Sequence, residues 1–542
     1  MMRYSKHYFV FALGFAAACG AFVGCDDDDA GGSPPPPKAD AASDVTSSDV
    51  TVAADVGPVV GTVQPTGVRA FLGIPYAAAP VGARRWKAPA EARWSEPRAA
   101  KAFGPRCFGV SLLDSNAVRT GASEDCLSLN IWAPPGGSGP KAVVFWIHGG
   151  GLVDGTGADY DGAALAHAGD VVVVSINYRL GALGSLALSS SDGGGNLSLL
   201  DQQFALQWVH RNIVAFGGDP SRVTLAGESA GGQFACTHAA MPSSQGLFSA
   251  LLTESSSCDG TRTPDQAAAA ANALAKSWGC AENDAGSDAG APLDEACLRA
   301  LPPETIVRGN QAIGVLPIVD GQLLPETPRA AMAAGRFAKV PVLAGFNANE
   351  GFFFTDGQMG ALPLSTPSDY TTALGMAFGP LGPMVEKEYP LSSYGSDPRT
   401  AMAAVMGDAS AECPTRKLIA SSTAPVFAYL FSHATKLASP KPVQAMHTIE
   451  LPYVWGTPLP WTWWQEERPG VPTTDKELEL AARVKRHWAN FIKAHDPSDS
   501  TSAAWPAWSS ASPNAMVFSE DPSVAPLPVN AHCAFWESLY GG

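Results

Sequence analysis

The chain has 542 residues, of which 46% are hydrophobic and 16% are charged, so it is long and apolar enough to bury a large core. Its formal net charge is −16, and so acidic a chain lacks the basic surface with which proteins bind nucleic acids. Part of this charge is local, because eight aspartates and a single lysine fall between residues 26 and 55.

The N-terminus has the pattern of an export signal. Arg3 and Lys6 precede an apolar stretch, Tyr8 to Val23, that is too short to span a bilayer comfortably. A glycine then precedes Cys25, as in a bacterial lipobox. The pattern predicts a signal peptide over residues 1–24 and a lipid on Cys25, which makes the chain a membrane-anchored lipoprotein of the cell envelope. The alternative is an ordinary signal peptide, secretion and a free Cys25 thiol.

Residues 25–56 are mainly Asp, Gly, Pro, Ser and Ala, with four consecutive prolines from Pro34 to Pro37. Such a composition cannot bury a core, and it predicts a disordered tether. No second linker and no internal repeat follows. We therefore expect residues 57–542 to form one domain.

Strand and helix patterns alternate along this domain. Continuous apolar runs typical of buried parallel strands lie at 141–147, 171–177, 222–226, 340–345 and 425–431. Helices are expected at 197–216, at 233–240 and, outside the sheet, in the alanine-rich segment of about 264–303. This order predicts an α/β fold in which a mostly parallel twisted sheet has helices on both faces and helical insertions.

The pattern Gly227-Glu-Ser229-Ala-Gly231 lies between an expected strand and an expected helix. In that context GxSxG indicates a nucleophile elbow, a tight turn that lifts the serine hydroxyl above the sheet. Glycines are common in ordinary turns, and the flanking elements favour the catalytic interpretation. The run His148 to Gly151 follows another strand, where backbone N–H groups are placed to bind a developing oxyanion.

A nucleophilic serine needs a base, and the base needs an orienting acid. Of the histidines after Ser229, His238 lies on the nucleophile helix, and His487 and His495 are expected at the surface of a polar helix. His447 is favoured over His433, which ends a strand and remains a competitor. The acid candidates are Glu350, after a strand, with Asp320 and Asp356 as alternatives.

From about Val68 to Tyr540 the chain resembles the type-B carboxylesterase and lipase family, the cholinesterase-like α/β-hydrolases. The matching stretches are Phe71–Ala77, Ser123–Trp132, Asn196–Gln202 and Phe216–Pro220, together with the motifs around Ser229, Glu350 and His447. The resemblance implies that Ser229, Glu350 and His447 are the catalytic triad. It also implies that the N–H groups of Gly150, Gly151 and Ala230 form the oxyanion hole.

The ten cysteines leave eight once Cys19 and Cys25 are set aside, and an even number in an exported chain favours disulfides. No CxxC pair occurs, so a metal site is not indicated. By position, the resemblance implies the pairs Cys107–Cys126, Cys280–Cys297 and Cys413–Cys533. Cys236 and Cys258 remain open between a fourth disulfide and a buried thiol.

Two departures from the family bear on the substrate. Leu152 stands where an aromatic residue usually follows the glycine run, and the Cys107–Cys126 loop contains no Trp. Cholinesterases place their cation-binding Trp in this loop, and its absence argues against choline esters. A cluster of Trp461, Trp463 and Trp464 either lines the entrance of the site or packs as a surface cap.

The expected function is hydrolysis of small to medium carboxylic esters through an acyl-enzyme, with no metal and no cofactor. The expected partners are a small-molecule ester and, through the lipid anchor alone, a membrane. Two alternatives remain open: a non-catalytic adhesion protein of the same fold and a true lipase acting on long-chain esters.

Overall fold

The computed structural model describes residues 48–112, 116–136, 139–281, 293–309, 315–355, 364–435, 444–457, 471–472, 474–499 and 504–540. The predicted signal peptide, Cys25 and most of the predicted tether lie outside these residues. So do Asp356 and the tryptophans at 461, 463 and 464.

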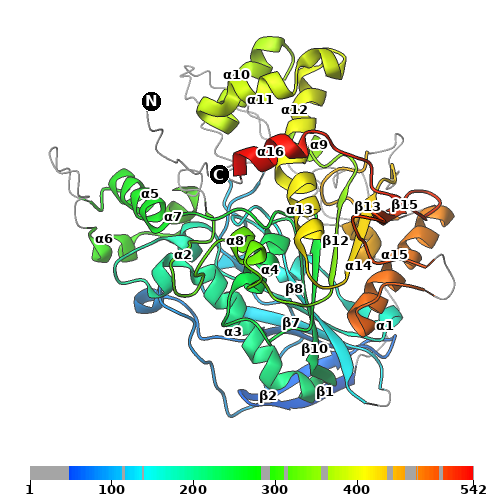
Figure 1. Cartoon of the computed structure of the whole chain (residues 1–542). Coiled ribbons are helices and arrows are strands. Elements are labelled where there is room, and N and C mark those ends of the chain that lie inside the picture. Colours follow the sequence, from blue (N-terminus) through cyan, green and yellow to red (C-terminus); the bar gives the residue numbers. More distant parts are fainter. Residues whose placement is uncertain are drawn as a thin grey trace, which may run out of the picture.

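A large mixed sheet forms the centre of the molecule (Figure 1). Its strands follow the spatial order β1-β2-β3-β7-β9-β8-β10-β11-β12-β13-β14-β15, and β4 pairs with β2. The bounds are β1 Ser48–Ala54, β2 Gly57–Val63, β3 Arg69–Pro75, β4 Arg98–Ala99, β7 Ser128–Ala133, β8 Lys141–Ile147, β9 Val172–Ile176, β10 Gly218–Glu228, β11 Ala250–Glu254, β12 Val342–Asn347, β13 Val426–Phe431, β14 Asn514–Phe518 and β15 Ser523–Pro526. A separate pair joins β5 Arg106–Cys107 to β6 Ala122–Ser123.

The strands from β9 to β14 run parallel, and antiparallel pairs extend the sheet at both ends. Side chains of β8 alternate between two apolar layers, with Val143, Phe145 and Ile147 in one and Val144 and Trp146 in the other. This two-sided burial is what a continuous apolar run predicts, because a parallel strand is covered on both faces. The predicted strands are confirmed.

Helices cover both faces, as Figure 1 shows. Their bounds are α1 Ala163–Gly169, α2 Gly181–Ser185, α3 Leu197–Asn212, α4 Ala230–Ala240, α5 Pro264–Ser277, α6 Glu295–Ala300, α7 Pro303–Arg308, α8 Pro328–Ala333, α9 Phe352–Thr355, α10 Pro367–Phe378, α11 Gly382–Glu388, α12 Pro398–Gly407, α13 Cys413–Ser421, α14 Leu451–Trp455, α15 Asp475–Ala494 and α16 Cys533–Tyr540. Helices α3, α4 and α8 pack on one face, and α1, α14 and α15 pack on the other. Helices α10 to α12 form a smaller cluster with α16 at the top of the view.

The first strand corrects the predicted end of the tether. Residues Ser48–Ala54 form β1 and pair along their whole length with Gly57–Val63 of β2. A segment of alternating Val and small residues forms an edge strand once a neighbour completes its hydrogen bonds. Amino-acid composition predicts a tether up to residue 56, because it carries no information about strand pairing. The folded domain therefore includes residues 48–56.

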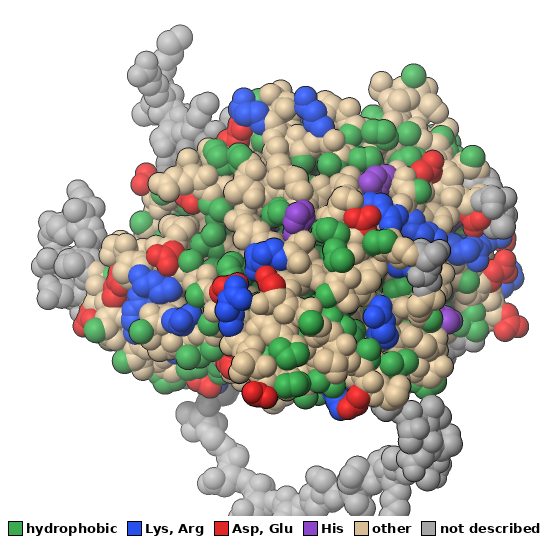
Figure 2. Space-filling model, turned by 90° about the horizontal axis from the view of Figure 1, so that it is seen from below, with side chains coloured by type: hydrophobic (Ala, Val, Ile, Leu, Met, Phe, Trp, Pro, Cys, Tyr) green, Lys and Arg blue, Asp and Glu red, His purple; other side chains and the backbone are tan. Residues whose placement is uncertain are grey.

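The surface seen from below carries basic and acidic side chains interspersed with apolar and neutral ones (Figure 2). Within the described residues no helix combines the length and the hydropathy that crossing a bilayer requires.

Candidate active site

Ser229 lies in the turn between β10 and α4, at the carboxyl end of the central strands. Its backbone adopts φ 54° and ψ −123°, a conformation that residues with a side chain rarely adopt. Two glycines make the turn possible. A Cβ on Gly227 would lie 2.4 Å from the carbonyl carbon of Gly231, and one on Gly231 would lie 2.0 Å from the carbonyl oxygen of Ile147. The turn holds the serine side chain at the surface of the sheet, where it is partly exposed.

His447 and Glu350 meet Ser229 from two other segments. Nε2 of His447 lies 2.8 Å from Oγ of Ser229, and Nδ1 lies 2.6 Å from Oε2 of Glu350. With the imidazole proton on Nδ1, the ring donates to Glu350 and accepts the serine hydroxyl. His447 and Glu350 are buried, with 5% and 3% of their surfaces exposed. The three side chains thus form a continuous relay from a buried carboxylate to an accessible hydroxyl.

The turn after β12 fixes the orientation of the acid. The backbone N–H of Asn347 donates to Oε1 of Glu350 at 2.7 Å, which leaves Oε2 for the histidine. The rings of Phe353 and Phe354, on α9, lie with their centroids 5.4 and 5.5 Å from that of His447. A carboxylate held by a backbone donor and an imidazole held by two aromatic rings have little freedom to leave this arrangement.

The glycine run after β8 forms a turn beside Ser229. Gly150 and Gly151 have φ values of 109° and 60°, and a Cβ on Gly149 would lie 3.3 Å from Cβ of Ser229. In the described part of the chain, the N–H groups of Gly150, Gly151 and Ala230 donate to no other residue. Unpaired N–H groups next to a nucleophile are suited to bind an oxyanion.

A group of buried acids that was not predicted from the sequence surrounds His447 and Glu350. Glu228, Glu254 and Glu450 are at most 1% exposed, and Oε1 of Glu228 lies 3.3 Å from Nε2 of His447. Burial, and then the charges of Glu450 and Glu350, raise the pKa of Glu228 well above its usual value. Burial and the charge of Glu350 raise the pKa of Glu450 to about 7. The raised pKa favours the neutral form of Glu228, whereas Oε2 of Glu350 makes the shorter contact with His447, at 2.6 Å.

A sequence signal for this group does exist. Glu228 and Glu254 are the last residues of two apolar strands, where a charged side chain is unusual, and they are aligned across the sheet. Glu450 follows His447 by three residues and accepts hydrogen bonds from Asn347 and Ser255. A carboxylate that ends a buried strand is a candidate for a perturbed pKa.

The other predicted candidates lie elsewhere. His433 is 3.6 Å from Glu477 and does not reach Ser229, and Asp320 accepts backbone N–H groups in its own turn. His238 is buried against Gln202 and Ser244. The prediction that His487 lies at the surface is wrong, because it is 1% exposed and packs its ring against Trp505. A polar helix still buries one face, and His487 is on that face of α15.

All eight expected cysteines are paired. The structure forms Cys107–Cys126, Cys280–Cys297 and Cys413–Cys533 as expected, and it resolves the open pair as Cys236–Cys258. Disulfides persist in oxidising compartments, so four of them fit an exported protein. Among the described residues no three His, Cys, Asp or Glu side chains are grouped to hold a metal ion.

Comparison with known proteins agrees with this geometry. The model of the carboxylesterase family matches residues 48–536. The chain belongs to the carboxylesterase family. The cholinesterase of Mus musculus is 32% identical over 91% of this chain and 87% of its own length, and the acetylcholinesterase of Bungarus fasciatus is 30% identical over 90% and 86%.

Solved structures extend the similarity to three dimensions. A thermophylic PNB esterase superposes with a TM-score of 0.75 at 32% identity, covering 90% of this chain and 99% of that one. A second PNB esterase structure gives a TM-score of 0.74 at 31% identity. This carboxylesterase therefore has the predicted α/β-hydrolase fold, and it is a carboxylic ester hydrolase.

Proposed function

We propose that this carboxylesterase hydrolyses small to medium carboxylic esters through an acyl-enzyme formed on Ser229. The observation that carries the proposal is the relay of 2.8 and 2.6 Å from the hydroxyl of Ser229 through His447 to Glu350. A serine hydroxyl is a weak nucleophile by itself and is activated by a base within hydrogen-bond reach. The second carboxylate oxygen of Glu350 is already occupied, so the acid is set to hold the imidazole and to stabilise its cation.

The steps follow from the positions of the groups. Oγ of Ser229 attacks the ester carbonyl carbon while Nε2 of His447 takes the hydroxyl proton. The carbonyl oxygen becomes negative and is bound by the N–H groups of Gly150, Gly151 and Ala230. Collapse of this intermediate expels the alcohol, which takes the proton from His447. Water then attacks the acyl-enzyme by the same route and releases the carboxylic acid and the free serine.

The proposed substrate range excludes choline esters as the preferred class. The loop closed by Cys107 and Cys126 contains no Trp, so it offers no indole face to a quaternary ammonium group. The relatives are named a cholinesterase, an acetylcholinesterase and a PNB esterase, so ester hydrolysis is common to their names and choline is not. An uncharged ester of modest size is therefore the substrate class that we propose.

An acyl-chain series tests the range. With p-nitrophenyl acetate, butyrate, octanoate and palmitate, we expect kcat/KM to be highest among the short esters. We expect it to be at least about tenfold lower for palmitate, a loss of roughly 1.4 kcal/mol of transition-state binding. Acetylthiocholine, compared with an uncharged acetate ester of similar size, checks the exclusion of choline esters. A preference for the insoluble palmitate would show a lipase and overturn the proposed range.

We also propose that Cys25 carries a lipid that anchors the enzyme to the cell envelope. The support is the sequence, in which an apolar stretch ends in glycine and Cys25 and a polar segment follows. Replacing Cys25 with alanine is expected to abolish incorporation of labelled palmitate and to move the enzyme from the membrane to the soluble fraction. The kcat/KM of each molecule is expected to stay unchanged. Cys19→Ala, inside the predicted signal, is the control, and an unlabelled wild type would contradict the anchor.

A further inference from the structure

The turn that holds the proposed oxyanion donors has an unusual backbone. Gly150, Gly151 and Leu152 are consecutive residues with positive φ, and Leu152, at 65°, has a side chain that disfavours this region. Two backbone hydrogen bonds close the turn, from the N–H groups of Val153 and Asp154 to the carbonyl oxygen of Gly150. Such a conformation persists only where surrounding contacts over-determine it.

Asp154, at the end of the turn, makes several such contacts. Its side chain is 3% exposed, and its Oδ1 accepts the backbone N–H of Gly155 at 2.7 Å. Nε of Arg119 lies 3.0 Å from Oδ1 and 2.8 Å from Oδ2, and a terminal nitrogen of the same guanidinium also binds Oδ2. Arg106 adds a second guanidinium 3.6 Å from Oδ1, and the N–H of Leu112 lies 3.4 Å from Oδ2. The negative charge of the buried Asp154 carboxylate is thus balanced by two guanidinium groups and two backbone N–H groups.

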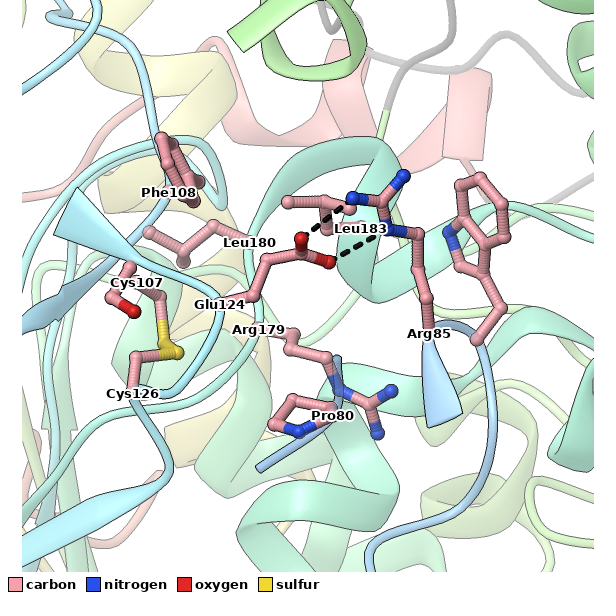
Figure 3. A pocket seen from close by; sticks show the side chains of 11 residues that line it. Pro80, Arg85, Cys107, Phe108, Glu124, Cys126, Arg179, Leu180 and Leu183 are labelled. Carbon is pink, nitrogen blue, oxygen red and sulfur yellow. Dashed lines mark hydrogen bonds and ion pairs between the residues drawn. A yellow bond between two sulfur atoms is a disulfide. The ribbon is translucent and has the colours of Figure 1, made fainter. Parts of the chain in front are cut away.

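Arg119 is anchored through its backbone, whose N–H donates to the carbonyl oxygen of Gly109 at 3.1 Å. Arg119 belongs to the loop closed by the Cys107–Cys126 disulfide, and Figure 3 shows this disulfide near the ion pair of Arg85 and Glu124. Two hydrogen bonds of 2.7 and 2.6 Å make that ion pair bidentate. The loop also bonds the turn directly, through the N–H of Val110 and the carbonyl oxygen of Val153. The described part of this loop therefore contacts the turn through both Arg119 and Val110.

The inner side of the turn is held by other means. The ring of His148 stacks on Tyr178 at 4.4 Å between centroids, and the Tyr178 hydroxyl donates to the carbonyl oxygen of His148. A Cβ on Gly155 would lie 2.3 Å from Nδ1 of His148, so the two ends of the turn are in close contact. The stack sets where the turn begins, and the Asp154 carboxylate lies at the opposite end.

We propose that Asp154 is a positioning residue for the oxyanion hole, which it holds in shape by binding Arg119. The inference rests on the proposed function, because it assigns the N–H groups of Gly150 and Gly151 to the oxyanion. A turn free to relax would leave these N–H groups pointing away from the developing charge. The oxyanion exists only along the reaction path, so the loss falls on kcat, with KM little changed.

The test compares Asp154→Asn with the wild type. The amide keeps the size of the side chain and an acceptor for Gly155 but loses the charge that binds Arg119. We expect kcat to fall about 10- to 100-fold, below the 10²–10³ of losing a donor outright, with KM within about threefold. Affinity for a trifluoromethyl ketone, which forms a tetrahedral oxyanion on the serine, is expected to fall by the same factor as kcat/KM. A merely structural role would not produce this proportionality.

Arg119→Gln removes the other partner of the same ion pair. The Arg119 side chain is 24% exposed, and replacing it leaves no buried cation. This variant is expected to reproduce the loss in kcat, and the double variant is expected to be no worse than the more impaired single variant. Glu326→Gln, which breaks the surface ion pair with Arg336, is the matched control. Its kcat is expected to stay within about twofold of the wild-type value.

Three results have distinct meanings. A wild type that an organophosphate fails to label on Ser229 overturns the proposed function itself. Normal labelling of the wild type, together with full kcat in Asp154→Asn and Arg119→Gln, overturns the positioning role alone. Variants that lose kcat while binding the trifluoromethyl ketone as tightly as the wild type also overturn it.

Discussion

Replacing Ser229 with alanine is expected to reduce turnover of p-nitrophenyl acetate by at least about 10⁴-fold, because the proposed acyl-enzyme can no longer form. The proposed oxyanion donors and the base remain, and they account for whatever slow hydrolysis persists. Turnover is followed by release of p-nitrophenol, and labelling by a radioactive organophosphate reports the nucleophile directly. We expect one label in each wild-type molecule and none in the variant.

The control for this change is Ser221→Ala. Ser221 is an exposed serine on the same strand, β10, and its hydroxyl binds only Asp219 among the described residues. It is expected to keep wild-type turnover and labelling. Full activity or normal labelling of Ser229→Ala would show that the relay seen in the structure is not the catalytic apparatus.

Replacing Glu350 with glutamine is expected to lower kcat by roughly 10⁴-fold. The glutamine amide donates to Nδ1 of His447 where the carboxylate accepted, so the imidazole proton moves to Nε2. In that tautomer Nε2 cannot accept the proton of Ser229. The variant is also unable to stabilise the imidazolium, which forms when the serine attacks. Measured kcat, with KM from the same progress curves, separates this loss from weaker binding.

Glu386→Gln is the matched control, since Glu386 lies on α11 and binds the hydroxyl of Thr371 at the surface. Near-normal kcat in Glu350→Gln would assign the orienting role to another acid. Glu228 is then the alternative, because it is the other carboxylate within 4 Å of the His447 ring among the described residues. The double variant with Glu228→Gln would settle that case.

Much of the sheet could be predicted from local sequence. The run Lys141–Ile147 is apolar on both faces, and only a strand buried between two helical layers satisfies such a run. Burial on both faces also explains why the parallel strands were easier to predict than β1. Ser48–Ala54 is an edge strand with alternating exposure, and it becomes recognisable only beside Gly57–Val63.

The buried acids were not predictable from composition, because a carboxylate is ordinarily placed at the surface. Glu254 is tolerated inside because the indole N–H of Trp488, 234 residues away, donates to it at 2.7 Å. Burial raises its pKa well above the usual value, and the charge of Glu450 raises it further. The end of an apolar strand marks Glu254 as unusual, but the sequence near it does not reveal the Trp488 partner.

The elbow of Ser229 and the glycine run beside it could be predicted from local sequence. Both are short turns in which residues close in sequence meet. A Cβ on Gly227 would collide with Gly231, and a Cβ on Gly150 would collide with Asp154. The sequence already favoured His447 over His433, and in the structure His447 lies at hydrogen-bond distance from Ser229 while His433 lies beside Glu477. The pairing of Cys236 with Cys258 and the contact of Asp154 with Arg119 became visible only in the tertiary structure. These contacts join segments that lie apart in the sequence. His447 and Ser229, for example, are separated by 218 residues. Spacing along the chain does not predict contacts of this kind, because they arise when helices and strands pack around a common core.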